Sequence, residues 1–111
     1  MSANLDQVMK TKGIVCAIEF DKDGHPLASK GDVSEEIVDV LADLFSANMR
    51  MAKMEAHLFS VESGLNGFSD ELTGFAMFGN ELAMCVIENV GVVVNSAEAD
   101  LNQIYETLAT A

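Results

Sequence analysis

Basic residues are scarce in this sequence. Its 111 residues include 6 Lys or Arg against 18 Asp or Glu, which gives a formal net charge of −12. Proteins that hold nucleic acid neutralise its phosphates with Lys and Arg, so this balance excludes a nucleic-acid binder. An anionic membrane surface would repel the chain for the same reason. We therefore expect partners that are neither nucleic acid nor membrane.

Long hydrophobic runs are also missing. The longest uninterrupted apolar run, Leu82–Ile87, falls far short of the ~18 residues that a membrane span needs. The first ten residues lack the apolar centre of a signal peptide, so we expect a cytoplasmic protein. The single Pro and eight Gly favour a fold with few elaborate loops. Since 50% of the residues are hydrophobic, we expect residues 1–111 to fold as one domain rather than remain disordered.

Groupings of residues that support catalysis or bind a cofactor are lacking as well. Cys16 and Cys85 have no CxxC partner and lie in apolar runs, which is typical of buried, reduced thiols. His25 and His57 lie far apart and outside any cluster with metal-ligand spacing. No nucleophile elbow of the GxSxG type occurs. We therefore expect no enzyme, no bound cofactor and no metal ion.

The acidic segment 19–24 comes nearest to a metal-binding motif. An EF-hand loop that began at Glu19 would place Lys30 where a bidentate Glu is required, and Pro26 just after its Gly. The dipeptide Asp23-Gly24 is a strong signal for a hairpin turn. We interpret the segment as a hairpin tip with solvated carboxylates.

The hydrophobic pattern predicts three helices and five strands. The expected elements are a helix over 3–11, strands over 14–20 and 27–29, a helix over 35–59, a loop over 61–71, strands over 72–78, 81–87 and 90–94, and a last helix that opens at 95–98. Three apolar runs separated by two-residue turns predict an antiparallel meander. The order α-β-β-α-β-β-β-α predicts an α+β fold, an α/β/α sandwich. The long helix would cover one face of a five-stranded antiparallel sheet, and the two terminal helices the other.

The predicted helix over 35–59 carries more apolar surface than one sheet needs. One stripe consists of Ile37, Leu41, Leu44, Met51 and Leu58, and a second of Val38, Phe45, Met49 and Ala52. At ~1.5 Å per residue this helix would be ~37 Å long, which exceeds the width of a domain of this size. Either the helix breaks, or part of it lies against something outside the chain.

The first 60 residues resemble the Roadblock dynein light-chain family, which has a profilin-like fold. The resemblance rests on Leu5–Val8, on the Gly-led strand 13–17 and on the Asp-Gly-x-Pro hairpin at 23–29, and an Ala- and Met-rich middle helix follows. The rest of the chain matches in element order, although the spacing of the meander differs. The resemblance implies a non-catalytic homodimer or heterodimer that scaffolds motors or regulates small GTPases. No catalytic residue transfers from it.

We predict a non-enzymatic homodimer that acts as a scaffold or regulator, with a Ras-like GTPase as a partner by family analogy. Its acidic surface would meet a basic patch on that partner. Met-rich surfaces repack around partners, and the cations at 50, 53 and 57 share one helix face. The predicted interface consists of Val38, Phe45, Met49, Arg50, Ala52, Lys53, Ala56 and His57.

Two structural explanations compete with this interface. The methionines could fill the core of the chain itself, and the cations could form a solvated face paired with Glu55 or Asp43. An alternative function is a small-molecule sensor or carrier of PAS-like or profilin-like architecture. Such a domain needs an apolar pocket between sheet and helix. Candidate lining residues are Phe75, Met77, Phe78 and Met84.

Overall fold

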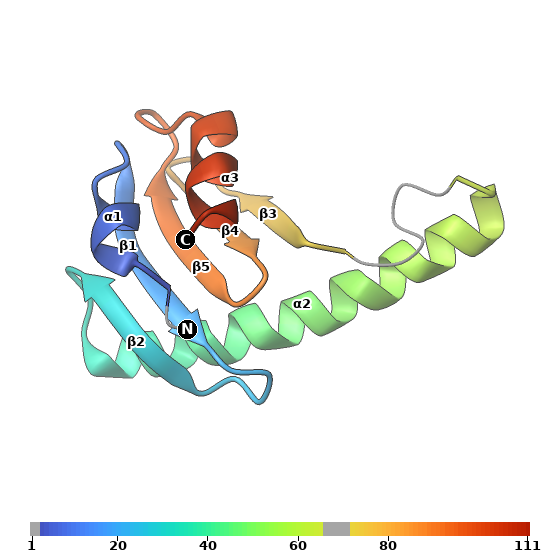
Figure 1. Cartoon of the computed structure of the whole chain (residues 1–111), viewed down its shortest axis with the longest axis horizontal. Coiled ribbons are helices and arrows are strands. Elements are labelled where there is room, and N and C mark those ends of the chain that lie inside the picture. The colour runs from blue at the N-terminus through green and yellow to red at the C-terminus, as the bar shows by residue number, and fades with distance from the viewer. Residues whose placement is uncertain (1–2, 66–71) are drawn as a thin grey trace.

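The computed structural model describes residues 3–65 and 72–111 and confirms the predicted order of helices and strands (Figure 1). The elements are α1 (Leu5–Met9), β1 (Ile14–Phe20), β2 (Pro26–Gly31), α2 (Glu35–Ser63), β3 (Gly74–Phe78), β4 (Leu82–Ile87), β5 (Val90–Asn95) and α3 (Leu101–Ala109). The five strands form one antiparallel sheet in the order β2-β1-β5-β4-β3. As expected, α2 lies on one face of the sheet and the two short helices lie on the other (Figure 1).

The two faces of the sheet have separate hydrophobic cores. The core under α1 and α3 contains Leu5, Val8, Ala17, Ala83, Cys85, Val90, Val92, Val94, Ile104 and Leu108. The core under α2 contains Cys16, Ile18, Phe20, Val38, Leu41, Ala42, Phe45, Met49, Val86 and Val93. Strands β1 and β5 are central and contribute to both cores, because successive side chains of a strand point to opposite faces. This explains why both strands read as nearly continuous apolar runs.

Phe45 occupies the centre of the core under α2. Its side chain is 0% exposed and its ring centroid lies 5.9 Å from that of Phe20. The ring rests on Gly91 of β5, where an added Cβ would collide with it. A glycine in a central strand therefore provides the space into which the largest fully buried side chain of α2 packs.

Helix α2 is longer than the sequence predicts. It begins where expected, with the Ser34 hydroxyl accepting a hydrogen bond from the Ile37 amide at 3.3 Å. It continues without a break to Ser63 and is capped by Gly64 in the left-handed conformation. The predicted loop was therefore wrong over 61–63, and its residues 66–71 lie outside the described residues.

Other boundaries also differ from the prediction, and those of β3, β4 and β5 differ by only one or two residues. Helix α1 spans only Leu5–Met9, and β2 is longer than expected because it spans Pro26–Gly31. Helix α3 begins after Asp100, whose carboxylate accepts hydrogen bonds from the amides of Asn102 and Gln103. The earlier Asn95 only closes a local turn by accepting from the Ala97 amide, so the predicted start at 95–98 was wrong.

Candidate protein–protein interface

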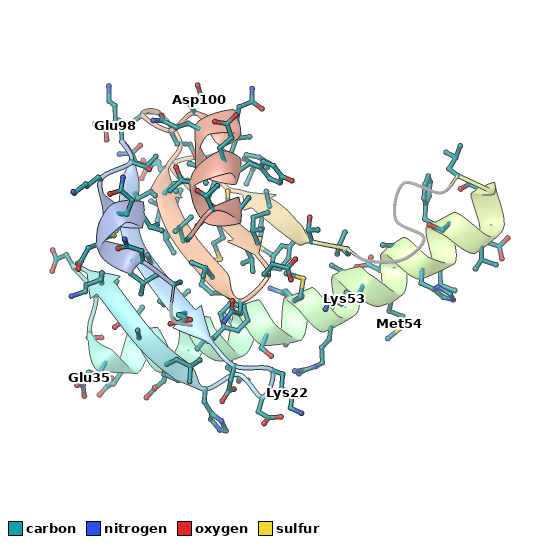
Figure 2. All side chains as sticks on the ribbon, viewed as in Figure 1. Lys22, Glu35, Lys53, Met54, Glu98 and Asp100 are labelled. Carbon is teal, nitrogen blue, oxygen red and sulfur yellow. The ribbon has the colours of Figure 1, made fainter. Side chains whose placement is uncertain are left out.

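Helix α2 extends beyond the sheet that it covers. Figure 1 shows it crossing one face and continuing past the edge formed by β3. Its 29 residues correspond to ~43 Å of helix, and the longest dimension of the structure is 42 Å. Among the described residues, no strand lies against the end of α2 that carries Met54 in Figures 1 and 2.

A stripe of apolar side chains runs along α2 on the side that faces away from the sheet. Its exposed members recur with the 3-4 spacing of a heptad repeat, and half-buried Ala47 completes the pattern. We call this stripe the outer seam; it consists of Ile37, Val40, Leu44, Ala47, Met51, Met54, Leu58 and Val61. The exposed fraction reaches 61% at Met51 and 64% at Met54. A continuous apolar stripe of this kind is typical of a surface that another protein covers.

The structure corrects part of the predicted interface. Val38, Phe45 and Met49 are buried in the core under α2, so the chain's own sheet already covers them. Of the methionines, the competing explanation of core filling holds for Met49, whereas Met51 and Met54 are exposed. Ala56 is also buried, and Ala52 is half-buried.

The predicted cations are exposed on a flank of α2. The Nη1 atom of Arg50 donates hydrogen bonds to the carbonyl oxygen of Lys22 at 3.2 Å and to the Ser46 hydroxyl at 2.9 Å. The Ser46 hydroxyl also donates to the Lys22 carbonyl, at 3.0 Å, so these bonds tie α2 to the β1–β2 hairpin. Arg50 and Lys53 both line a cleft of about 620 Å³ between α2 and the β1–β2 hairpin. His57 lies one turn further along α2. Within the described residues, neither Asp43 nor Glu55 forms an ion pair with these cations.

The edge strand β3 is a second candidate contact surface. It contains no charged residue and no proline, the two devices that commonly prevent an edge strand from pairing with another chain. Met77 is 48% exposed and Phe78 is 61% exposed. Strand β3 thus combines an unprotected edge with exposed apolar side chains, and it lies beside α2, which it contacts.

The hydrogen bonds at the two ends of β3 show which of its backbone groups point toward β4 and which point outward. The Gly79 amide donates to the Leu82 carbonyl, and the Glu88 amide donates to the Thr73 carbonyl. Backbone groups alternate in direction along an antiparallel strand, so the odd-numbered residues 73–79 point their N–H and C=O groups at β4. The N–H and C=O groups of Gly74, Ala76 and Phe78 therefore point away from the sheet.

A cavity of about 270 Å³ lies between α3 and strands β3 and β4. Its lining is mostly apolar and consists of Thr73, Gly74, Phe75, Ala76, Cys85, Ile87, Leu101, Ile104, Tyr105 and Leu108. Of the four residues predicted to line a pocket, only Phe75 contributes. Phe75 and Met84 pack against the core under α2, whereas Met77 and Phe78 are exposed.

The β1–β2 turn has the predicted form of a hairpin tip. The Asp21 carboxylate accepts hydrogen bonds from the amides of Asp23 and His25, both at 2.9 Å, and these bonds lower its pKa. One ligand atom from each of Asp21, Asp23 and His25 lies within 4.8 Å of the others. The turn itself accounts for this proximity, since His25 Nδ1 is also 3.4 Å from the second Asp21 oxygen.

Both cysteines are free and buried, as predicted. Burial raises the pKa of the Cys16 and Cys85 thiols, which keeps them protonated and poorly nucleophilic. Among residues 3–65 and 72–111, no helix is both long and apolar enough to cross a membrane.

Comparisons with known proteins identify the fold. A family model described as uncharacterized conserved protein (DUF2173) matches residues 4–110. No curated protein matches the chain in sequence.

Several solved structures match the fold over nearly the whole chain. A Roadblock/LC7 domain from Streptomyces avermitilis is 14% identical with a TM-score of 0.74, and the match covers 94% of this chain and 83% of that one. The gliding protein MglB from Thermus thermophilus is 19% identical with a TM-score of 0.74, with coverages of 93% and 76%. An MglB with a tetrameric arrangement is 19% identical with a TM-score of 0.75, with coverages of 93% and 75%. The five-stranded sheet and its helices therefore form a Roadblock-type fold, as the sequence resemblance predicted.

Proposed function

Since the chain belongs to the family of uncharacterized conserved proteins DUF2173 and has a Roadblock-type fold, we propose that it is a non-enzymatic, homodimeric regulatory scaffold. Two copies join through the outer seam of α2 and the free edge of β3. The paired subunits then present their acidic surface to a protein partner.

The outer seam is the observation that carries this proposal. Seven of its eight side chains are at least 44% exposed in the isolated chain, although they are Ile, Val, Leu and Met. Burying apolar surface contributes roughly 25 cal/mol per Å², so covering this seam stabilises an assembly. A heptad spacing of 3 and 4 is the spacing with which one helix packs against another. A two-fold axis perpendicular to α2 makes the two helices antiparallel, and in the proposed dimer the same axis brings the two β3 edges together.

Light scattering on the purified chain at micromolar concentration tests the dimer. We expect a mass of two chains for the native protein. Replacing the 55% exposed Leu58 with Lys places a charge in the seam and is expected to raise the dissociation constant of the dimer about tenfold or more. Leu27→Lys is the matched control, because Leu27 is 59% exposed on β2 at the opposite edge of the sheet. A native chain that is monomeric in this experiment contradicts the proposal.

A Ras-like GTPase is the partner that the family resemblance supports. The chain carries a net charge of −12, so it would associate with a basic patch and the association rate constant should fall as salt concentration rises. Stopped-flow binding to GTP-loaded and GDP-loaded Ras-like GTPases of the source organism measures this rate constant. If the dimer is intact but binds none of these GTPases, the GTPase part of the proposal is wrong and the homodimeric scaffold remains.

A further inference from the structure

We propose that the chain binds a small alkyl amine in another cavity, where the buried carboxylate of Glu19 holds its ammonium group. This cavity of about 220 Å³ lies on the face of the sheet that carries α1 and α3, and we call it the Glu19 cavity. Its lining consists of Ala3, Glu19, Ile87, Glu88, Asn89, Val90, Leu108, Ala109 and Ala111. All of these residues belong to one subunit, so the inference does not depend on the homodimer.

Glu19 is a buried carboxylate with no positively charged partner among the described residues. Only 5% of its surface is exposed, and it forms no ion pair within residues 3–65 and 72–111. Its Oε2 atom accepts a hydrogen bond from the Ala3 amide at 3.1 Å, whereas its Oε1 atom accepts none from the described residues. A carboxylate can accept about four hydrogen bonds, and a buried one is rare unless it is paired. The unused acceptor in the cavity therefore indicates a ligand that donates hydrogen bonds and carries positive charge.

The end of α3 adds negative potential to the same cavity. Leu108 and Ala109 lie in the last turn of α3 and line the cavity. The C-terminal end of a helix dipole carries partial negative charge and stabilises a nearby cation. The last turn of α3 contains no basic residue that would use this potential. The net charge of −12 also attracts cations, so both the local and the overall field favour a positively charged ligand.

A strained turn holds a second carboxylate at the opening of the cavity. Glu88 is exposed and has a φ of 54°, and among the described residues it is the only one other than glycine with a positive φ. Its amide donates to the Thr73 carbonyl at 2.7 Å, and the Asn89 carbonyl accepts from the Phe20 amide at 3.0 Å. These bonds fix the turn on both sides. Backbone strain of this kind clusters at binding sites, and here it keeps Glu88 beside the cavity.

The remaining walls of the cavity are mostly apolar. Ile87, Val90 and Leu108 offer a surface for a short carbon chain, while the carboxylate of Glu19 receives the ammonium group. A metal ion would need several oxygen ligands, and among the described residues Glu19 belongs to no group of three side chains that could hold one. The lining therefore favours an alkylammonium ion over a metal ion. A second ammonium group on the same chain would reach Glu88.

Isothermal titration calorimetry with butylammonium chloride at constant ionic strength tests the site. We expect saturable binding to the native chain and a dissociation constant at least about tenfold higher for Glu19→Gln. Glutamine keeps an oxygen that accepts from the Ala3 amide, so circular dichroism should show the native fold. Glu98→Gln removes the same charge from an exposed residue before α3 and should bind like the native chain. 1-Butanol has the same carbon chain without the charge and should bind at least about tenfold more weakly.

Two results of this titration would overturn the inference. One is a native chain that binds butylammonium no better than 1-butanol. The other is a folded Glu19→Gln variant that binds butylammonium with native affinity. Neither result depends on whether the chain is a dimer, so the titration and light scattering fail independently.

A diamine tests the part that Glu88 plays. 1,4-Diaminobutane carries a second ammonium group, so we expect it to bind about tenfold more tightly than butylammonium. Glu88→Gln should bring the two dissociation constants to within about twofold of each other. Nα-acetyl-lysine amide carries the same alkylammonium group on a peptide unit and should bind more weakly than the diamine, since the site takes a free amine. Tighter binding of the blocked lysine would overturn the free amine as the ligand, and a diamine that binds no more tightly than butylammonium would overturn the role of Glu88.

Discussion

The variant Ala76→Pro is expected to be monomeric at concentrations where the native chain is dimeric. Ala76 directs its N–H away from β4, so proline removes no hydrogen bond from the subunit's own sheet. It removes the hydrogen bond that the Ala76 N–H would donate to the β3 strand of a second copy and places a ring in its path. We expect the dissociation constant to rise at least about a hundredfold, measured by light scattering over a dilution series.

Two further measurements make this result interpretable. Ala76→Ser keeps the N–H group and should dimerise like the native chain. Far-UV circular dichroism should show the same secondary structure for both variants, because proline is tolerated on an edge strand when its nitrogen faces outward. A folded Ala76→Pro variant with native dimer affinity would show that β3 takes no part in the interface.

Phe45→Ala is expected to destabilise the fold rather than only separate two subunits. Phe45 is 0% exposed and packs against Phe20 and over Gly91. Truncating a buried Phe to Ala typically costs about 3–5 kcal/mol, because apolar contacts are lost and a cavity remains. Urea unfolding at one fixed chain concentration measures the loss, since dimerisation would otherwise change the apparent stability.

Lys53→Ala is the matched control on the same helix. Its side chain is exposed and forms no ion pair among the described residues, so its effect should stay within about 0.5 kcal/mol. A Phe45→Ala variant that keeps its full unfolding free energy but becomes monomeric would return Phe45 to the interface that the sequence predicted.

The sequence predicted the elements well because each has a local cause. The apolar strands, the Asp23-Gly24 turn and the Ser34 cap all act within a few residues. The end of α2 was missed although its stop signal, the left-handed cap at Gly64, is a glycine that the sequence shows. The cap at Asp100 was missed because Asn95 offers the same chemistry five residues earlier.

The interface was harder to predict than the fold. Sequence periodicity showed that α2 has two apolar stripes, but it did not decide which one faces the sheet. Gly91 was the sequence signal for this, because a glycine in a central strand marks a place where another group approaches the backbone closely. In the structure that group is the Phe45 ring. The corresponding signal for the outer seam was the seven-residue repeat of apolar side chains between Ile37 and Val61. The free groups of β3 depend on its pairing with β4, which a single sequence does not show.

Hydrogen exchange at the β3 edge tests the homodimer most directly. The amides of Gly74, Ala76 and Phe78 point away from β4 and have no backbone acceptor among residues 3–65 and 72–111, so we expect them to exchange fast in a monomer. In a dimer joined at this edge they donate to the partner strand. We predict that their exchange slows as chain concentration is raised, while the outward amides of β2 stay fast. Exchange of these three amides that remains fast at every concentration would contradict the account.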